Sequence, residues 1–173
     1  MILQKKICML GSMGVGKTSL VRRFVESLFS DSYQATVGVK IDRKSLTVGG
    51  VTLNLMLWDL QGEAEHQTTR MEYLRGSAGY LLVADQTRAS SLATALDLAR
   101  RAAEITPAAG MVLVVNKMDL EVGREVSDIT LTGLSQEGIK VVRTSARTGA
   151  GVEEAFRQLA DQLLAQARPV EES

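Results

Sequence analysis

Short apolar runs alternate with stretches of helical periodicity along almost the whole chain of 173 residues. Two of the runs, Gly79–Ala84 and Met111–Val115, are continuously apolar, which is typical of strands covered on both faces. The stretch between them, Ala89–Ile105, is rich in Ala and Leu and is soon followed by Pro107, so it favours a surface helix. This alternation predicts a three-layer α/β fold in which helices cover both faces of a mostly parallel sheet.

Two further strand-like segments, Val39–Val48 and Val51–Trp58, flank the pair Gly49–Gly50. A glycine pair suits the positive φ angles of a tight hairpin turn, so one antiparallel edge strand is predicted. The other strands are predicted at Ile2–Leu10 and Lys140–Thr144, and the other helices at Lys17–Leu28, Glu121–Gly138 and Val152–Ala167. Since neither a repeat nor a linker is visible, residues 1–173 are expected to form a single domain.

Composition and charge argue against several classes of protein. The 20 Lys and Arg balance the 20 Asp and Glu, so the net charge favours neither a nucleic-acid nor an anionic-membrane partner. No apolar stretch reaches the roughly 18–20 residues of a membrane-spanning helix. The single cysteine, Cys8, excludes an intramolecular disulfide. With Ile2 in second place and no cysteine near the end, no lipid anchor is expected, and a cytoplasmic monomer is predicted.

The first predicted strand runs into a segment that matches the phosphate-binding pattern G-x-x-x-x-G-K-[ST]. Glycines let successive backbone N–H groups turn inward, and the N-terminus of the following helix adds to such an anion site. Lys17 is predicted to reach the outer phosphates of a nucleotide, and the Thr18 hydroxyl to be a Mg²⁺ ligand. A glycine-rich surface turn with an exposed lysine is the alternative. The nucleotide-binding residues predicted here are Ser12, Met13, Gly14, Val15, Gly16, Lys17, Thr18 and Ser19.

The second hairpin strand ends in the segment Trp58-Asp59-Leu60-Gln61-Gly62. An aspartate at the carboxyl end of a strand, near a phosphate loop, can hold a Mg²⁺-bound water. Gly62 would let its backbone N–H approach a terminal phosphate. Alone, the pattern D-x-x-G fits an ordinary turn equally well. Its place behind a phosphate loop favours the metal and phosphate role.

The apolar run Met111–Val115 ends in Asn116-Lys117-Met118-Asp119. A carboxylate here can accept hydrogen bonds from N1–H and N2–H₂ of guanine, donors that adenine lacks, and such a site can discriminate by about 10⁴–10⁵. The stem of Lys117 would cover the face of the base. The last strand ends in Thr144-Ser145-Ala146-Arg147, where the small Ala146 would allow a backbone N–H contact with guanine O6. A capped turn after a strand is the alternative.

The four stretches GSMGVGKT, WDLQG, NKMD and TSAR occur in this order and at intervals usual for Ras-like small GTPases. The chain therefore resembles that family over about Lys5 to Leu164, nearest to its Rab and Rho branches because of the Trp-Asp-x-x-Gly form. The resemblance implies a phosphate-loop GTPase domain with a six-stranded sheet, about five helices, bound GTP or GDP, and Mg²⁺. It also implies a switch in which two loops order around the γ-phosphate and loosen after hydrolysis.

Aligned on Thr36, the resemblance implies that Phe29 contacts the base, that Tyr33 is the switch tyrosine, and that Thr36 is a further Mg²⁺ ligand. It equates the two switch loops with Phe29–Val39 and Asp59–Arg75. Effectors, exchange factors and GTPase-activating proteins would bind there. The full set of residues then expected is: for Mg²⁺, Thr18, Thr36 and Asp59; for the base, Phe29, Tyr33, Asn116, Lys117, Asp119, Ser145, Ala146 and Arg147; and for catalysis, Lys17, Thr36, Gly62 and Glu63.

Glu63 departs from the family, which usually has a water-orienting glutamine at this position. A carboxylate can accept a hydrogen bond from that water, but its negative charge would also oppose the γ-phosphate. Slow GTP hydrolysis by a molecular switch is the first hypothesis, and a guanine-nucleotide-binding scaffold with negligible hydrolysis is the second. A third, an ATP-using enzyme, conflicts with Asp119. Met13 is expected to obstruct an inserted arginine, and Arg100 and Arg101 to lie on a solvated helix face.

Overall fold

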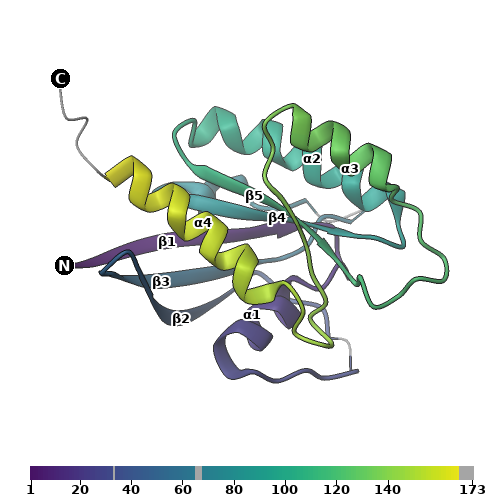
Figure 1. Cartoon of the computed structure of the whole chain (residues 1–173), viewed down its shortest axis with the longest axis horizontal. Coiled ribbons are helices and arrows are strands. Elements are labelled where there is room, and N and C mark those ends of the chain that lie inside the picture. The colour runs from purple at the N-terminus through teal and green to yellow at the C-terminus, as the bar shows by residue number, and fades with distance from the viewer. Residues whose placement is uncertain (33, 65–67, 168–173) are drawn as a thin grey trace.

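One six-stranded sheet forms the centre of the protein in a computed structural model, which describes residues 1–32, 34–64 and 68–167 (Figure 1). The strand order is β2-β3-β1-β4-β5-β6. Only β2 and β3 are antiparallel, and the other neighbouring pairs are parallel, as predicted. The strands are β1 (Ile2–Gly11), β2 (Val39–Val48), β3 (Val51–Leu60), β4 (Gly79–Asp85), β5 (Gly110–Asn116) and β6 (Val141–Arg143).

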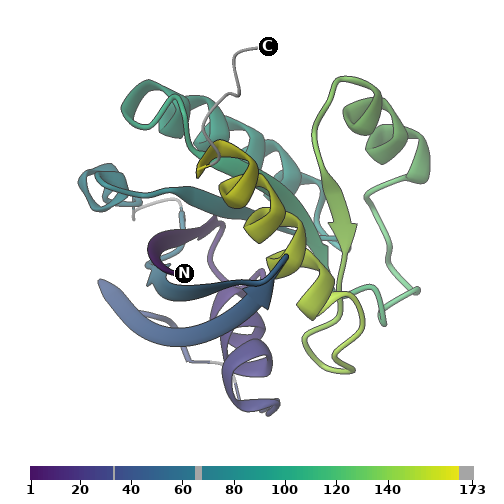
Figure 2. The same ribbon diagram turned by 60° about the vertical axis from the view of Figure 1, so that its left-hand side comes forward.

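Helices cover both faces of this sheet, with α1 and α4 on one side and α2 and α3 on the other (Figure 2). The part of the chain that the structure describes contains four α-helices and one short 3-10 helix. They are α1 (Lys17–Glu26), η1 (Met71–Leu74), α2 (Ala89–Ile105), α3 (Asp128–Gln136) and α4 (Val152–Ala167). None of these helices is both long enough and apolar enough to cross a membrane.

The about five helices that the resemblance implied are, among the described residues, four α-helices and the 3-10 helix η1 of the second switch segment. The backbone becomes extended at Arg75, where ψ is 132°, and turns into the left-handed region at Gly76, where φ is 77°. Two consecutive residues outside the helical region end η1 after a single turn.

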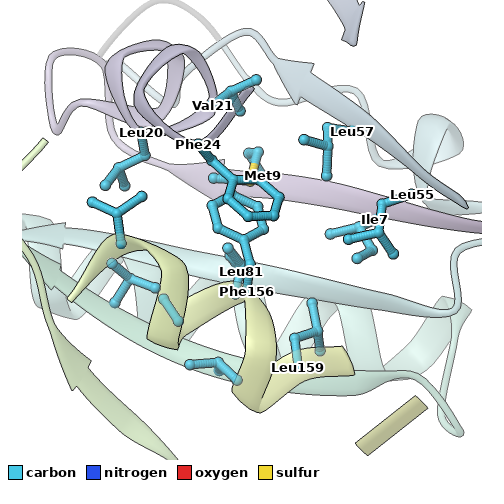
Figure 3. Close-up of a cluster of buried hydrophobic side chains, with 14 of the residues drawn as sticks. Ile7, Met9, Leu20, Val21, Phe24, Leu55, Leu57, Leu81, Phe156 and Leu159 are labelled. Atoms are coloured by element: carbon cyan, nitrogen blue, oxygen red, sulfur yellow. The ribbon is translucent and has the colours of Figure 1, made fainter. Parts of the chain in front are cut away.

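The strand β1 divides its side chains between two apolar cores, as the two-residue period of a strand requires. Ile7 and Met9 enter the core beneath α1 and α4, where Phe24 and Phe156 stack with ring centroids 3.9 Å apart (Figure 3). Cys8 and the other alternate residues enter the core beneath α2. Because both faces are covered in this way, the carboxyl ends of the parallel strands remain the open edge of the sheet.

Candidate functional site

A pocket of about 360 Å³ opens where β1, β3 and β5 end. Segments far apart in the sequence meet there, because parallel strands end at the same edge of a sheet. Of the predicted site residues, those that line the pocket are Met13, Gly14, Gly16, Lys17, Thr18, Ser19, Phe29, Thr36, Gly62, Asn116, Lys117, Asp119, Ala146 and Arg147. Those outside the lining are Ser12, Val15, Asp59, Glu63 and Ser145, and Tyr33 lies outside the described residues.

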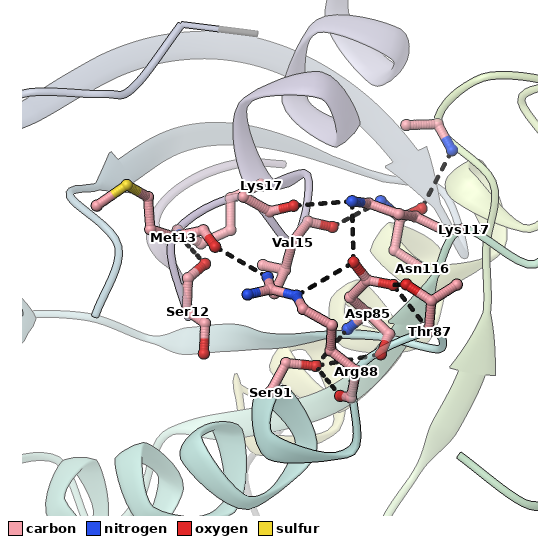
Figure 4. A network of polar contacts seen from close by, with 12 residues as sticks. Ser12, Met13, Val15, Lys17, Asp85, Thr87, Arg88, Ser91, Asn116 and Lys117 are labelled. Carbon is pink, nitrogen blue, oxygen red and sulfur yellow. Dashed lines mark hydrogen bonds and ion pairs between the residues drawn. The ribbon is translucent and has the colours of Figure 1, made fainter. Parts of the chain in front are cut away.

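The phosphate loop (Gly11–Thr18) depends on glycine where it approaches the base motif. Gly16 has a φ of 102°, and a Cβ built there would lie 2.3 Å from Nδ2 of Asn116. That amide instead donates to the carbonyl oxygen of Val15 at 3.0 Å (Figure 4). The loop is therefore bonded directly to the segment predicted to recognise the base, over 101 residues of sequence.

The Lys17 ammonium is held inside the phosphate loop. The residue is 6% exposed, and Nζ donates to the carbonyl oxygens of Gly11 and Ser12 at 3.0 and 3.1 Å. Burial lowers the pKa of Lys17 to about 8, although the negative charge of Asp59 acts in the opposite direction. A buried cation of this kind, with two neutral partners, suits an anionic ligand.

Three oxygen-bearing side chains from three segments meet beside this lysine. The Thr18 and Thr36 hydroxyl oxygens are 2.7 Å apart, and the Thr18 hydroxyl donates to Oδ2 of Asp59 at 2.5 Å. Asp59 is 1% exposed, and its second oxygen, Oδ1, is buried and has no hydrogen-bond partner among the described residues. Burial raises the pKa of Asp59, while the bond from Thr18 and the charge of Lys17 oppose that rise.

These donors fit the Mg²⁺ ion that the resemblance implies. Mg²⁺ prefers hard oxygen ligands and usually takes one or two carboxylates together with substrate phosphates. The unpartnered Oδ1 of Asp59 is the kind of buried polar atom that a bound cation or its water satisfies. The three residues expected to hold the metal therefore lie together in the structure.

The base motif is organised by buried hydrogen bonds. The side-chain oxygen of Asn116 accepts from the Thr144 hydroxyl at 3.0 Å and from the Ala146 N–H at 3.2 Å. The Ser145 hydroxyl donates to Oδ1 of Asp119 at 2.8 Å. Ser145 does not line the pocket itself, and its hydroxyl holds the carboxylate of Asp119, which does.

Gly62 lies against the phosphate loop. The chain leaves β3 and runs back beside it, where the Met13 N–H donates to the Glu63 carbonyl oxygen at 2.8 Å and the Glu63 N–H donates to the Gly11 carbonyl oxygen at 3.0 Å. A Cβ built on Gly62 would lie 2.6 Å from the Met13 backbone nitrogen. This close approach requires glycine, and it joins the start of the second switch segment to the loop.

The Glu63 side chain is directed away from the pocket. Its Oε2 accepts from the Thr69 N–H at 2.7 Å, and its Oε1 forms an ion pair with Arg101 of α2. Both carboxylate oxygens are therefore engaged, which gives no support to the expectation that this side chain orients the attacking water. The prediction for Arg101 was wrong, since its guanidinium lies between α2 and the switch segment rather than on a solvated face.

Comparison with known proteins agrees with this geometry. A model of the Ras family matches residues 6–165. The chain is 37% identical over 163 residues to "Ras-related protein Rab-4B" of Homo sapiens, which covers 92% of this chain and 76% of that protein. It is 36% identical to "Ras-related protein Rab-4A" of Mus musculus (92% and 74% covered) and 34% identical to "Ras-related protein Rab-13" of Canis lupus familiaris (92% and 79%). The chain therefore belongs to the Ras family of small GTPases.

Proposed function

We propose that this chain is a GTP-dependent molecular switch that hydrolyses GTP to GDP slowly. The observation that carries the proposal is that one pocket is lined by the phosphate loop, by Thr36 and by Asp119. Directly behind Thr18 and Thr36 in that lining lies the carboxylate of Asp59. The switch loops would be Phe29–Val39 and Asp59–Arg75. Their order would depend on the γ-phosphate, and effectors, exchange factors and GTPase-activating proteins would recognise that difference.

The proposed reaction is in-line attack of water on the γ-phosphate, catalysed mainly by positioning and charge stabilisation. Lys17 would bind the outer phosphates, and the Gly62 N–H would approach the terminal one. Thr18, Thr36 and Asp59 would hold Mg²⁺, which when bound neutralises negative charge on the phosphates. Because the carboxylate of Glu63 is engaged elsewhere, no side chain at that position would orient the water, and slow hydrolysis follows.

The same ion pair favours a second candidate, a guanine-nucleotide-binding scaffold with negligible hydrolysis. Nucleotide identity and phosphate release, measured on one purified sample, separate the hypotheses. The switch predicts GTP or GDP in the sample and slow release of phosphate in a single turnover. Bound GTP without phosphate release supports the scaffold. Displacement of labelled GTP by an equal concentration of ATP contradicts both.

Glu63→Gln is expected to raise the single-turnover rate of GTP hydrolysis by about 10²-fold, the lower end of what one group positioned on the reacting water contributes. The amide loses the ion pair with Arg101 and the charge repulsion with the γ-phosphate, yet it still hydrogen-bonds water. Glu63→Ala is the control and should hydrolyse no faster than the unmodified chain. A large fall in rate in Glu63→Ala would show instead that the native carboxylate takes part in the reaction.

The affinity for GDP is expected to fall as the pH rises through about 8. In the free protein Lys17 loses its proton near its pKa of about 8, whereas bound phosphates favour the charged form. Since the bound state holds more protons, each pH unit above this value lowers the affinity by at most about tenfold. Titration with GDP and with guanosine over the same pH range tests this. A flat profile for GDP, or an equal fall for guanosine, contradicts it.

A further inference from the structure

Asp85 ends β4 at the edge of the sheet that carries the pocket, yet it belongs to none of the four sequence motifs. Its side chain is 2% exposed. Burying a carboxylate is costly unless cations and hydrogen-bond donors surround it. The partners of Asp85 therefore indicate why the charge is there.

The strongest partner of Asp85 is Lys117 of the base motif, whose Nζ lies 2.9 Å from Oδ2 (Figure 4). On the other oxygen, Oδ1 accepts from the Thr87 N–H at 2.9 Å and from the Thr87 hydroxyl at 2.7 Å. A second cation, Arg88, brings Nε to 3.4 Å from Oδ2. Burial disfavours the charged carboxylate, but the bonds from Lys117 and Thr87 outweigh it and keep the pKa of Asp85 below its usual value.

Both cations also donate hydrogen bonds to the phosphate loop. The Lys117 ammonium also donates to the carbonyl oxygen of Gly14 at 2.9 Å. The Arg88 guanidinium donates through Nη2 to the carbonyl oxygen of Met13, also at 2.9 Å. One buried carboxylate thus lies between two cations that hold two consecutive carbonyl groups of the loop.

The direction of these carbonyl groups determines the direction of the loop N–H groups. A trans peptide is planar, and its N–H points opposite to its C=O. The Met13 carbonyl shares a peptide with the Gly14 N–H, and the Gly14 carbonyl shares one with the Val15 N–H. Arg88 and Lys117 hold the two carbonyl oxygens on their own side of the loop. The two N–H groups therefore point to the side away from these cations. A loop that binds phosphate through its backbone requires N–H groups on one side.

The backbone of Lys117 gives a second, independent indication. Its φ is 68°, a left-handed conformation that is uncommon for residues other than glycine, and its side chain is 33% exposed. A conformation of this kind persists where surrounding contacts impose it. Without Asp85, the ammonium would keep only the Gly14 carbonyl and would be free to turn toward solvent.

We propose that Asp85 is a positioning residue of the nucleotide site, which holds Lys117 and Arg88 so that the base motif and two peptides of the phosphate loop keep their binding geometry. This inference rests on the proposed function, because it assigns the loop and Lys117 to guanine-nucleotide binding. Asp85 itself is not among the residues that line the pocket. Its effect passes through the two cations.

Release of a fluorescent N-methylanthraniloyl-GDP into excess GDP tests the proposal in the whole chain. Asp85→Asn is expected to release the nucleotide about tenfold faster, the order of one charge-assisted hydrogen bond. Lys117→Ala should also release it faster. Because Asp85 acts largely through that ammonium, adding Asp85→Asn to Lys117→Ala should change the rate by less than about twofold.

Ser91→Ala is the matched control for a purely structural role. The Ser91 hydroxyl accepts from the Asp85 backbone N–H at 2.8 Å and is buried, so this variant should lower the midpoint of thermal unfolding and leave nucleotide release within about twofold. If Asp85→Asn does not fold, Thr87→Val replaces it. That variant removes one hydrogen bond to the carboxylate of Asp85. It should accelerate nucleotide release as a single variant but not when it is combined with Lys117→Ala.

Three results have distinct meanings in this experiment. An unmodified chain that does not retain the labelled nucleotide would overturn the proposed function itself. If the unmodified chain retains the nucleotide tightly and Asp85→Asn releases it at the same rate, only the role of Asp85 is overturned. Full multiplication of the Asp85→Asn and Lys117→Ala effects would show that the carboxylate acts independently of Lys117, which overturns the role assigned to the Asp85–Lys117 pair.

Discussion

Asp119→Asn is expected to weaken GDP binding by about 10⁴-fold, the selectivity that a site gains when the wrong partner leaves polar groups unpaired. Asp119 is exposed in the free protein, and the bound base would cover it. The carboxylate offers two acceptors to the two donors on the guanine edge, and the Ser145 hydroxyl already orients it at 2.8 Å. An asparagine replaces one acceptor by a donor, which would face a donor on the base. We therefore expect this loss to come from base recognition rather than from folding.

Competition between labelled GDP and unlabelled GDP or ADP measures the effect. The preference for GDP over ADP should largely disappear in Asp119→Asn, because ADP gains nothing from the carboxylate that is lost. Asp161→Asn, which neutralises an exposed carboxylate on α4, is the control and should bind GDP normally. A guanine preference that survives in Asp119→Asn would mean that other residues recognise the base.

Lys17→Ala is expected to weaken GDP binding by about 10²–10³-fold, the order of two hydrogen bonds from one charged group. The variant removes the ammonium that lines the pocket and also removes one of the donors to each of the Gly11 and Ser12 carbonyl oxygens. Affinity for guanosine, which has no phosphates, should change little. Calorimetric titration with both ligands distinguishes the lost phosphate contact from a general effect.

Lys140→Ala removes an exposed lysine and serves as the control for the change in net charge. It should bind GDP with the affinity of the unmodified chain. A parallel fall for GDP and guanosine in Lys17→Ala would indicate that the phosphate loop has collapsed. Unchanged GDP binding would remove Lys17 from the site altogether.

The ion pair between Glu63 and Arg101 gives the departure from the family at this position a structural explanation. A glutamine cannot form that ion pair, whereas the glutamate joins the switch segment to α2 and accepts the Thr69 N–H. Orientation of the attacking water would therefore favour glutamine at this position, whereas the contact with α2 favours glutamate. The measured rate in Glu63→Gln will show which demand this sequence satisfies.

Local patterns predicted most of the fold. The bounds of α2 and α4 agree with the prediction, because amphipathic spacing and a following break are encoded by neighbouring residues. The largest differences are at helix ends, and β3 and β6 differ from the prediction by one or two residues. α1 stops at Glu26 because Ser27 adopts a left-handed conformation, and α3 begins only after Ser127, whose hydroxyl accepts from the Thr130 N–H. Such conformations depend on the surrounding backbone more than on residue type.

Most of the residues proposed for the phosphates, the metal and the base could be named from the sequence because each motif occupies one short segment with a fixed spacing. Asp85 was partly readable, since it directly follows the apolar run Gly79–Ala84 at the end of a strand. Its partners were not, because Lys117 lies 32 positions further along the chain. Periodicity shows which face of an element is apolar and cannot show which polar side chains from distant elements meet.

Glu63 and Arg101 are a second pair of distant polar side chains whose contact could not be predicted from the sequence. The sequence determined their residue types and the elements that carry them, and from these an activated water and a solvated arginine were reasonable predictions. The rotation of α2 about its axis and the path of the chain after Gly62 brought the two side chains together over 38 residues. Both arise from packing against the sheet, which depends on contacts between distant residues and has no signature in either local segment.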